Sequence, residues 1–301
     1  MSKHHSVAIG MPVYNCERTV AEAISSILNQ TLEDWELIVY DDGSHDDTVC
    51  VARKFSDPRI KVVEGGKNCG LPSCLNEIIN LCRSEYFARM DGDDIAYPNR
   101  LRNQLDFLRN HANVDLVAGC IIVFRSDGVA LGVRRGVATH EQICAHPWSG
   151  IPMAHPTWMG RTDWFRRNPY NADMSLMEDW ELLFRTYRHS IFANVPEIVL
   201  GYREDSLSLR KTLVARWHKC KAMLRSAKED CTRWHAASGI AGQMSRSLVD
   251  ITAIGLNLNY LLLKHRAPPV LYEEVAVWQD VLKKTRETVL NQTMPHEAVS
   301  A

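Results

Sequence analysis

A cluster of acidic residues follows an apolar segment in the first third of the chain. Residues 86–90 are largely apolar, and Asp91, Gly92, Asp93 and Asp94 come directly after them. Because side chains alternate along an extended strand, Asp91 and Asp93 can point to the same side, and Gly92 leaves room for another group. Carboxylate oxygens suit Mg²⁺ or Mn²⁺, and such a cation could carry a diphosphate. The alternative is an ordinary acidic loop, since loops are solvated.

Three other polar or glycine-rich turns also follow apolar segments. Tyr14 follows residues 7–13, Asp41 and Asp42 follow residues 35–40, and a glycine-rich loop at 65–70 follows residues 59–64. In parallel α/β sheets, ligands bind beyond the carboxyl ends of the strands. The sequence therefore predicts that these turns meet at one edge and bind a nucleotide-like ligand. The alternative for Asp41 and Asp42 is an ordinary turn, because Asp-Gly is common in turns.

The elements that position these turns follow from hydrophobic patterning. Strands are expected at 7–13, 35–40, 59–64 and 85–90, and helices at 17–29, 46–55, 71–82 and from Pro98 onward. Later strands are expected at 116–124, 129–133 and 195–202, with a turn at Asp127-Gly128 and a helix from Met177. This alternation predicts an α/β fold with a mostly parallel sheet flanked by helices and right-handed crossovers.

Composition excludes several classes of protein. The chain has 301 residues and is 46% hydrophobic, which is enough for a sizeable core. A net charge of −1 gives no electrostatic footprint for nucleic acid, so no nucleic-acid partner is expected. The nine cysteines include no Cys-x-x-Cys pair, and their odd number without a secretory leader predicts reduced thiols and a cytoplasmic location. The nearly apolar run at 251–263 is too short to span a bilayer.

Several further polar residues leave two interpretations open. Glu178 and Asp179 could do chemistry, or could simply favour the first turn of a helix through its dipole. Asp94 could ligate a cation or cap the helix that follows Pro98. His155 could anchor a loop or act through a ring nitrogen. Arg203 could pair structurally or reach a phosphate.

The last third of the chain is expected to be helical. Residues 210–233 contain eight Lys or Arg against Glu229 and Asp230, with Trp217 and Trp234 interleaved or adjacent. A basic helix with aromatic residues can lie on an anionic membrane, which predicts a peripheral membrane contact through 210–234. The alternative is a helix packed on the rest of the chain with a solvated basic face. Residues 270–290 could cover the core or form a homodimer contact.

Taken together, these motifs resemble the family 2 inverting glycosyltransferases of the GT-A fold, of the bacterial surface-polysaccharide type. The matching segments are residues 11–15, 39–48, 68–71 with Asn76, 90–94, 98–101, 155–157, 178–182 and 201–203. They occur in the family's order and cover roughly residues 6–205. The resemblance implies a catalytic domain at 1–206, with a nucleotide-binding half at about 1–115 and an acceptor half at about 116–206. A helical C-terminal extension would occupy 207–301.

The resemblance also implies roles for individual residues. Donor binding is implied for Pro12, Tyr14, Asp41, Asp42, Asn68, Gly70 and Asp91, with Asp42 accepting a hydrogen bond from the nucleobase. Asp93, helped by Asp91, would ligate Mn²⁺ or Mg²⁺. Asp179 would be the general base, and Glu178 would support it or face the acceptor. The implied enzyme is of the hexosyltransferase type and moves a sugar from a nucleotide donor, expected to be UDP-linked. The acceptor would be a glycan or a lipid-linked molecule in surface polysaccharide biosynthesis.

These roles agree with elementary chemistry. The leaving diphosphate gains negative charge, which a divalent cation neutralises, and the acceptor hydroxyl needs a carboxylate to take its proton. One carboxylate opposite the leaving group gives a single displacement with inversion, whereas glycosidases use two carboxylates that flank the bond. The Gln-x-x-Arg-Trp sequence of processive synthases is absent, so one sugar per encounter is expected.

Two other functions compete with this interpretation. A sugar-phosphate nucleotidyltransferase would need a loop rich in glycine and arginine after its first strand, and residues 11–18 do not supply one. A non-catalytic nucleotide-sugar binding protein would be expected to lack the metal or base carboxylates, and both are present here.

Overall fold

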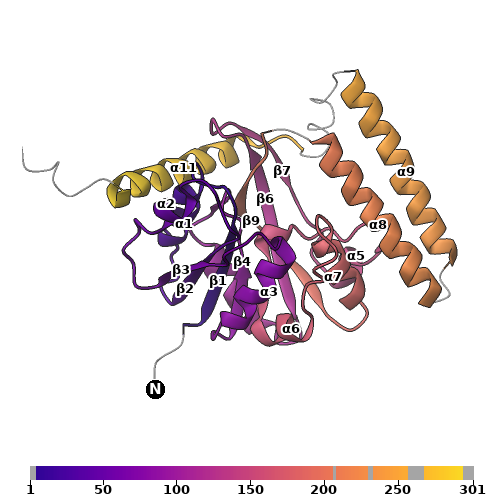
Figure 1. The fold of residues 1–301 in the computed structure, drawn as a ribbon, viewed down its shortest axis with the longest axis horizontal. Helices are drawn as coiled ribbons and strands as arrows, with labels where there is room; N and C mark the ends of the chain where they lie inside the picture. Colours follow the sequence, from indigo (N-terminus) through magenta and orange to yellow (C-terminus); the bar gives the residue numbers. More distant parts are fainter. Residues whose placement is uncertain (1–4, 206–207, 230–232, 257–267, 294–301) are drawn as a thin grey trace, which may run out of the picture.

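The structure is a computed structural model that describes residues 5–205, 208–229, 233–256 and 268–293. These residues form one mixed sheet of nine strands with helices on both faces, followed by long helices from the last third of the chain (Figure 1). The strand order is β3-β2-β1-β4-β8-β6-β9-β5, and β7 pairs with β6. The expected α/β class with a helical C-terminal extension is confirmed.

The first half of the sheet is parallel. Its strands are β1 (Val7–Val13), β2 (Trp35–Asp41), β3 (Ile60–Glu64) and β4 (Tyr86–Arg89). Val13 lies opposite Asp41, and Gly10 lies opposite Arg89, so the carboxyl ends of these strands share one edge. Strands β1 and β2 are buried along their whole length, as expected for parallel strands covered on both faces.

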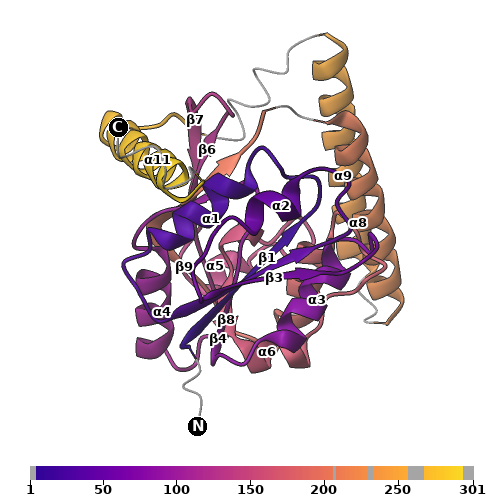
Figure 2. The same ribbon diagram turned by 60° about the vertical axis from the view of Figure 1, so that its left-hand side comes forward.

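Helices cover both faces of this parallel half (Figure 2). They are α1 (Val20–Leu28), α2 (Thr48–Ala52), α3 (Leu71–Leu81) and α4 (Arg100–Asn110). Ile24 of α1 shares a buried core with Ile9 on one face, whereas Ile78 of α3 packs with Phe87 on the other. Helix α1 begins three residues later than predicted, because the amides of Thr19 and Val20 both donate to the Cys16 carbonyl in a turn.

The second half of the sheet mixes parallel and antiparallel strands. It contains β5 (Ile95–Ala96), β6 (Leu116–Phe124), β7 (Ala130–Arg134), β8 (Met159–Arg161) and β9 (Phe192–Arg203). Strand β8 pairs antiparallel with both β4 and β6 and so joins the two halves. The sequence did not predict β5 and β8, which have two and three residues. The predicted final strand begins at Phe192, three residues before the expected start.

Short helices support this second half. They are α5 (His140–Ile143), the 3-10 helix η1 (His155–Thr157), α6 (Thr162–Arg167) and α7 (Glu178–Thr186). Helix α7 begins at Glu178, which places the two carboxylates predicted there in its first turn. Among the described residues, no helix has both the length and the apolar character needed to cross a bilayer.

The C-terminal helices lie on two sides of the molecule (Figures 1 and 2). Helices α8 (Leu209–Glu229) and α9 (Arg233–Gly255) lie side by side next to α7. Helix α11 (Tyr272–Thr293) lies against α1 on the opposite side. Its Trp278 is fully buried beside Phe124, with ring centroids 4.5 Å apart. Val281 and Leu282 are also buried, so this helix covers part of the hydrophobic core. A homodimer contact would have to use its exposed residues, such as Val277.

The predicted basic face of α8 is only partly solvated. Arg216 pairs with Asp250 of α9 at 2.5 Å. Lys219 is buried, and its Nζ donates to the Ser149 carbonyl at 2.8 Å. The side chains of Arg216 and Lys219 make these intramolecular contacts because their side of α8 packs on α9 and on the loop before η1. The part of the predicted membrane segment at 230–232 lies outside the described residues.

Candidate active site

The carboxyl ends of β1, β2 and β4 bring the predicted donor-side segments together. The amide of Asp42 donates to the Val13 carbonyl at 2.9 Å, and the amide of Met90 donates to the Gly10 carbonyl at 3.0 Å. The turn after β1 is tied to the turn after β2 because the Asn15 amide donates to Ser44 Oγ at 2.9 Å. The acidic cluster and both turns therefore follow neighbouring strands.

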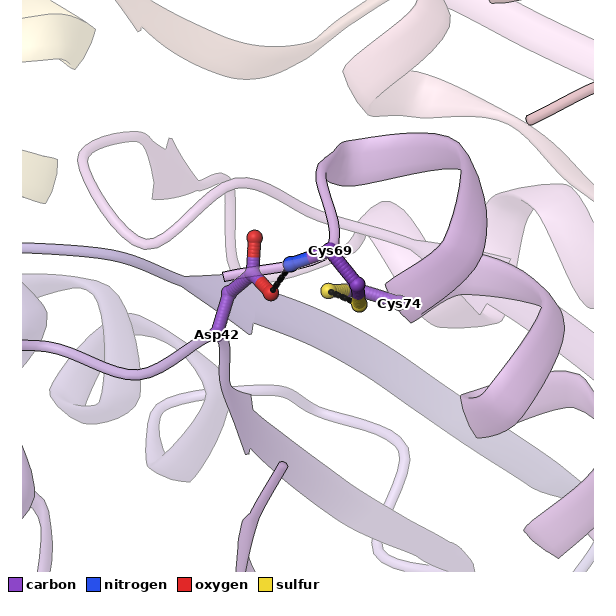
Figure 3. A group of neighbouring side chains, drawn as sticks. All are labelled: Asp42, Cys69 and Cys74. Carbon is purple, nitrogen blue, oxygen red and sulfur yellow. Dashed lines mark hydrogen bonds between the residues drawn. The ribbon is translucent and has the colours of Figure 1, made fainter. Parts of the chain in front are cut away.

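The carboxylates of Asp41 and Asp42 accept hydrogen bonds from the amides of different loops. Asp41 accepts hydrogen bonds from the amides of Gly43 and Ser44, at 3.1–3.2 Å, so it shapes the turn in which Gly43 has a φ of +77°. Asp42 accepts from the amide of Cys69 at 2.7 Å (Figure 3) and from the amide of Gly70 at 2.9 Å. The turn interpretation therefore fits Asp41, whereas Asp42 fixes the glycine-rich loop beside the end of β2.

The other predicted donor contacts surround this loop. Tyr14 is 43% exposed, with its ring centroid 6.5 Å from that of His45. Asn68 is exposed, and Gly70 has a φ of +86° at the start of α3. Pro12 is buried within β1, one residue from the edge. Exposed side chains thus flank a rigid backbone, which suits an incoming base and ribose.

The acidic cluster is compact. Asp91, Asp93 and Asp94 place one carboxylate oxygen each within 4.8 Å of one another. Partial loss of water around the Asp93 carboxylate, followed by the negative charge of Asp91, raises the pKa of Asp93 to about 6. Burial, followed by the charges of Asp93 and Asp91, raises the pKa of Asp94 well above its ordinary value. A divalent cation would relieve this repulsion, so the carboxylate set fits Mn²⁺ or Mg²⁺.

Asp94 has a structural contact that the sequence did not predict. It is fully buried, and its Oδ1 accepts from the Arg203 amide at 3.0 Å. Asp94 does not cap α4. The N-cap residue of that helix is Asn99, whose side chain makes no capping hydrogen bond among the described residues. The Oδ2 atom of Asp94 has no hydrogen-bond partner in the described part of the chain. One oxygen therefore joins the cluster to β9, while the other is left for a ligand.

Two arginines hold the acidic cluster in place. Arg203 donates from Nε to the Asp93 carbonyl at 2.8 Å, which supports the structural interpretation of this residue. Arg89 is almost fully buried at the end of β4 and forms an ion pair with Asp91. Two of its guanidinium nitrogens, Nε and Nη1, have no partner among the described residues. Arg89 was not predicted as a site residue, although an arginine inside a buried strand was a signal.

The two carboxylates at the start of α7 are Glu178, which is buried, and Asp179, which is half-buried. Glu178 is 6% exposed, and burial, followed by the charge of Asp179, raises its pKa to about 7. Burial also raises the pKa of Asp179. The hydrogen bond from the Trp180 amide and the positive charges of Arg89 and Lys219 lower it in part. Asp179 lines a cavity of about 390 Å³ together with His155, Arg134, Asn194 and Tyr202. This cavity is large enough for a sugar-sized group.

His155 is part of an aromatic cluster in the wall of this cavity. Its Nε2 lies 3.0 Å from the Tyr170 hydroxyl, and its ring centroid is 4.5 Å from that of Trp158. Burial, followed by the charge of Arg89, lowers the pKa of His155 well below its ordinary value. A neutral, packed imidazole fits the loop-anchoring interpretation.

Arg89 connects the two groups of carboxylates. Its positive charge acts on Asp91 and Asp94 at the metal-type cluster and on Glu178 at the start of α7. It also lowers the pKa of Asp179. The buried guanidinium of Arg89 therefore forms an ion pair with Asp91 and lies within electrostatic reach of the first turn of α7.

This arrangement defines the class of protein. A parallel half-sheet whose carboxyl edge carries a glycine-rich loop and an acidic cluster, joined to a mixed half-sheet, is the GT-A arrangement of nucleotide-sugar-dependent glycosyltransferases. The mannosyltransferase PcManGT from Pyrobaculum calidifontis, in complex with GDP-Man and Mn²⁺, has a TM-score of 0.58 to this chain. The likeness covers 98% of this chain and 89% of that one at 14% identity, so it shows the fold.

The family follows from the sequence comparison. Residues 8–192 match the family described as "Glycosyl transferase family 2", and the chain belongs to that family. EpsE from Bacillus subtilis (strain 168), which is named as a glycosyltransferase, is 35% identical over 219 residues, or 70% of this chain and 77% of EpsE. The family and the enzyme class expected from the motifs are thereby confirmed.

A second relative is named in more detail. The "UDP-Glc:alpha-D-GlcNAc-diphosphoundecaprenol beta-1,3-glucosyltransferase WfgD" of Escherichia coli is 33% identical over 123 residues. The match covers 41% of this chain and 48% of that relative, so this chain matches about half of its length.

Proposed function

We propose that the chain is a metal-dependent, inverting glycosyltransferase of surface polysaccharide biosynthesis. It would move a sugar from a nucleotide donor to a glycan or lipid-linked acceptor. The observation that carries this proposal is the compact carboxylate cluster of Asp91, Asp93 and Asp94, whose ion-paired Arg89 also acts electrostatically on Glu178 and Asp179. The UDP-Glc donor and diphosphoundecaprenol acceptor in the name of the Escherichia coli relative support a UDP-linked donor and a lipid-linked acceptor here.

On the donor side, this chain's residues would bind and orient the nucleotide. The glycine-rich loop is fixed to Asp42, and the exposed Tyr14 ring, next to the turn that is tied to Ser44, would cover a base. Asp91 and Asp93, with the unpartnered oxygen of Asp94, would hold Mn²⁺ or Mg²⁺. When bound, that cation supplies neutralisation of the charge that the diphosphate gains as it leaves. The Mn²⁺ and GDP-Man bound to PcManGT support this choice of partners.

On the acceptor side, Asp179 would take the proton of the attacking hydroxyl. It lines the cavity in which an acceptor sugar would lie. Burial raises the pKa of Asp179, which makes its carboxylate a stronger base, while Arg89 and Lys219 keep the ionised form accessible. Glu178, with a pKa of about 7, is partly protonated near neutral pH and would donate a hydrogen bond to an acceptor oxygen.

The proposal is tested by binding nucleotides to the full-length protein. UDP and GDP are added with and without Mn²⁺, and the melting temperature is measured. We expect one nucleotide to raise it, with most of the rise requiring Mn²⁺, and we expect Asp93→Ala to remove the part that requires Mn²⁺. Asp106→Ala, an exposed aspartate on α4, is the matched control and should behave like wild type. A rise that is independent of Mn²⁺, or unchanged in Asp93→Ala, contradicts metal-assisted donor binding.

The rest of the chain suggests where the enzyme works. We propose that residues 1–206 form the catalytic domain, and that 207–301 form an extension touching the inner face of the cell membrane from the cytoplasm. Trp217 on α8 is 61% exposed, with Lys221 Nζ 5.2 Å from its ring centroid. Met244 and Leu248 are exposed on α9. Exposed aromatic, apolar and basic side chains on adjacent helices support contact with an anionic surface.

A further inference from the structure

Two thiols and a carboxylate meet beside the donor edge, and two of these groups are not used in the proposed reaction. Cys69 Sγ and Cys74 Sγ lie 3.6 Å apart (Figure 3). A carboxylate oxygen of Asp42 completes a group in which all three ligand atoms lie within 4.8 Å of one another. The three residues come from the end of β2, the glycine-rich loop and the first turns of α3.

Backbone hydrogen bonds hold these three residues close together. The amides of Cys69 and Gly70 both donate to Asp42, which holds the loop against the end of β2. Gly70, with its φ of +86°, lets the chain turn into α3, and Cys74 then lies fully buried one turn later. Cys69 is exposed. The group is therefore closed on the side of Cys74 and open to solvent on the side of Cys69.

The sulfur spacing fits a tetrahedral cation. Zinc–sulfur bonds of about 2.3 Å at a tetrahedral angle place two thiolate sulfurs about 3.8 Å apart. The observed 3.6 Å is close to that value. A disulfide of about 2.05 Å would require the sulfurs to approach by about 1.5 Å and would leave Asp42 without a part in the bond.

We propose that Asp42, Cys69 and Cys74 form a three-ligand site for a thiophilic divalent cation such as Zn²⁺, with a fourth position open to solvent. On binding, two S–H bonds break, two metal–thiolate bonds and one metal–carboxylate bond form, and two protons pass to solvent without any change of oxidation state. Because two protons leave when the cation binds, the affinity for the cation should increase as pH rises.

The site would also control donor binding. This consequence rests on the proposed function, in which Asp42 accepts a hydrogen bond from the nucleobase. A cation bound by Asp42 takes the same carboxylate, so Zn²⁺ and the nucleotide should exclude each other. The carboxylate cluster of Asp91, Asp93 and Asp94 offers only hard oxygen ligands, which prefer Mg²⁺ or Mn²⁺. Mg²⁺ or Mn²⁺ at the carboxylate cluster would thus promote binding of the nucleotide donor, whereas Zn²⁺ at Asp42 would inhibit it.

Cobalt binding tests the site itself. The full-length protein, reduced with a phosphine, is titrated with Co²⁺ and the thiolate-to-cobalt charge-transfer absorption is recorded. We expect this band in wild type and its loss when Zn²⁺ is added. Cys69→Ser changes an exposed side chain and should weaken cobalt affinity by at least about 10-fold. Cys74→Ser should do the same. Cys50→Ser, an exposed cysteine on α2, is the matched control and should leave the band unchanged.

Two results overturn the proposal: a wild-type protein without the charge-transfer band, or a band that persists at wild-type affinity in Cys69→Ser. The effect on the donor is measured separately as the loss of nucleotide-induced stabilisation on adding Zn²⁺, which should be absent in Cys69→Ser. If no nucleotide binds at all, the proposed function fails while the cobalt result stands. If the nucleotide binds and Zn²⁺ binds without displacing it, the exclusion is wrong.

Discussion

Replacing Glu178 with glutamine should stabilise the protein at alkaline pH and change little at acid pH. Glu178 is 6% exposed, and its Oε2 has no hydrogen-bond partner among the described residues. Burial, followed by the negative charge of Asp179, raises the pKa of Glu178 from its ordinary 4.5 to about 7. Glutamine has nearly the same shape and no charge, so it removes the cost of a buried, unpaired carboxylate.

The sign of the effect follows from proton linkage. The pKa of Glu178 is higher in the folded chain, so the folded state holds this proton more tightly than the unfolded state. Below pH 4.5 the side chain is neutral in both states, and its titration costs no stability. As pH rises from 4.5 through about 7 the unfolded chain ionises first, so the folded state loses stability. The loss reaches about 3 kcal/mol above the folded pKa.

The prediction is measured by urea unfolding of wild type and Glu178→Gln below pH 4.5 and above pH 7. A difference of about 3 kcal/mol corresponds to a midpoint shift of about 1 M urea or more at the alkaline pH. Glu197→Gln, an exposed glutamate on β9, is the matched control and should shift the midpoint equally at both pH values. The reasoning is refuted if Glu178→Gln has the same effect at both pH values, or is less stable than wild type at the alkaline pH.

Two further predictions concern catalysis and location. Asp179→Asn keeps the shape of the side chain but removes the base, so turnover should fall by about 10²-fold or more while nucleotide binding stays near wild type; normal turnover would refute the base assignment. Flotation with anionic liposomes should recover the wild-type protein and much less of Trp217→Ser/Lys221→Glu, which removes the exposed ring and reverses the charge beside it. Lys283→Glu, at an exposed site on α11, is the charge-matched control, and equal flotation of all three proteins would argue against a membrane surface on α8.

The parallel half of the fold could be predicted from the sequence because each strand has a strong local signal. Residues 7–13 and 35–41 are apolar almost throughout and end in polar turns, so both the strands and their shared edge follow from patterning. The short strands β5 and β8 were missed because two or three residues carry no usable periodicity. They form where neighbouring strands supply hydrogen-bond partners, which is information from distant parts of the chain.

The carboxylates of the candidate site could be predicted, but their neighbours could not. The sequence left open whether Asp94 ligates a cation or caps the helix that follows Pro98, and only the fold reveals that Asp94 accepts from the amide of Arg203, 109 residues away. Lys219, predicted on a basic surface, instead lies buried within 4.8 Å of the Trp180 ring centroid and acts on Asp179. Contacts of this kind depend on how α8 meets α7, which local pattern does not encode.

The same long-range contacts connect the C-terminal helix to the acidic cluster. Arg286 of α11 donates from Nε to Glu22 Oε1 at 2.9 Å, and Arg203 Nη2 donates to Glu22 Oε2 at 2.6 Å. Arg203 in turn holds the backbone at Asp93 and the side chain of Asp94. Glu22 and Arg203 are largely buried, so their ion pair is less screened by water than a surface ion pair, whereas Arg286 is 45% exposed. The buried ring of Trp278 packs α11 on β6 and β9, and these contacts connect the helix through Glu22 and Arg203 to the turn that carries the predicted metal ligands.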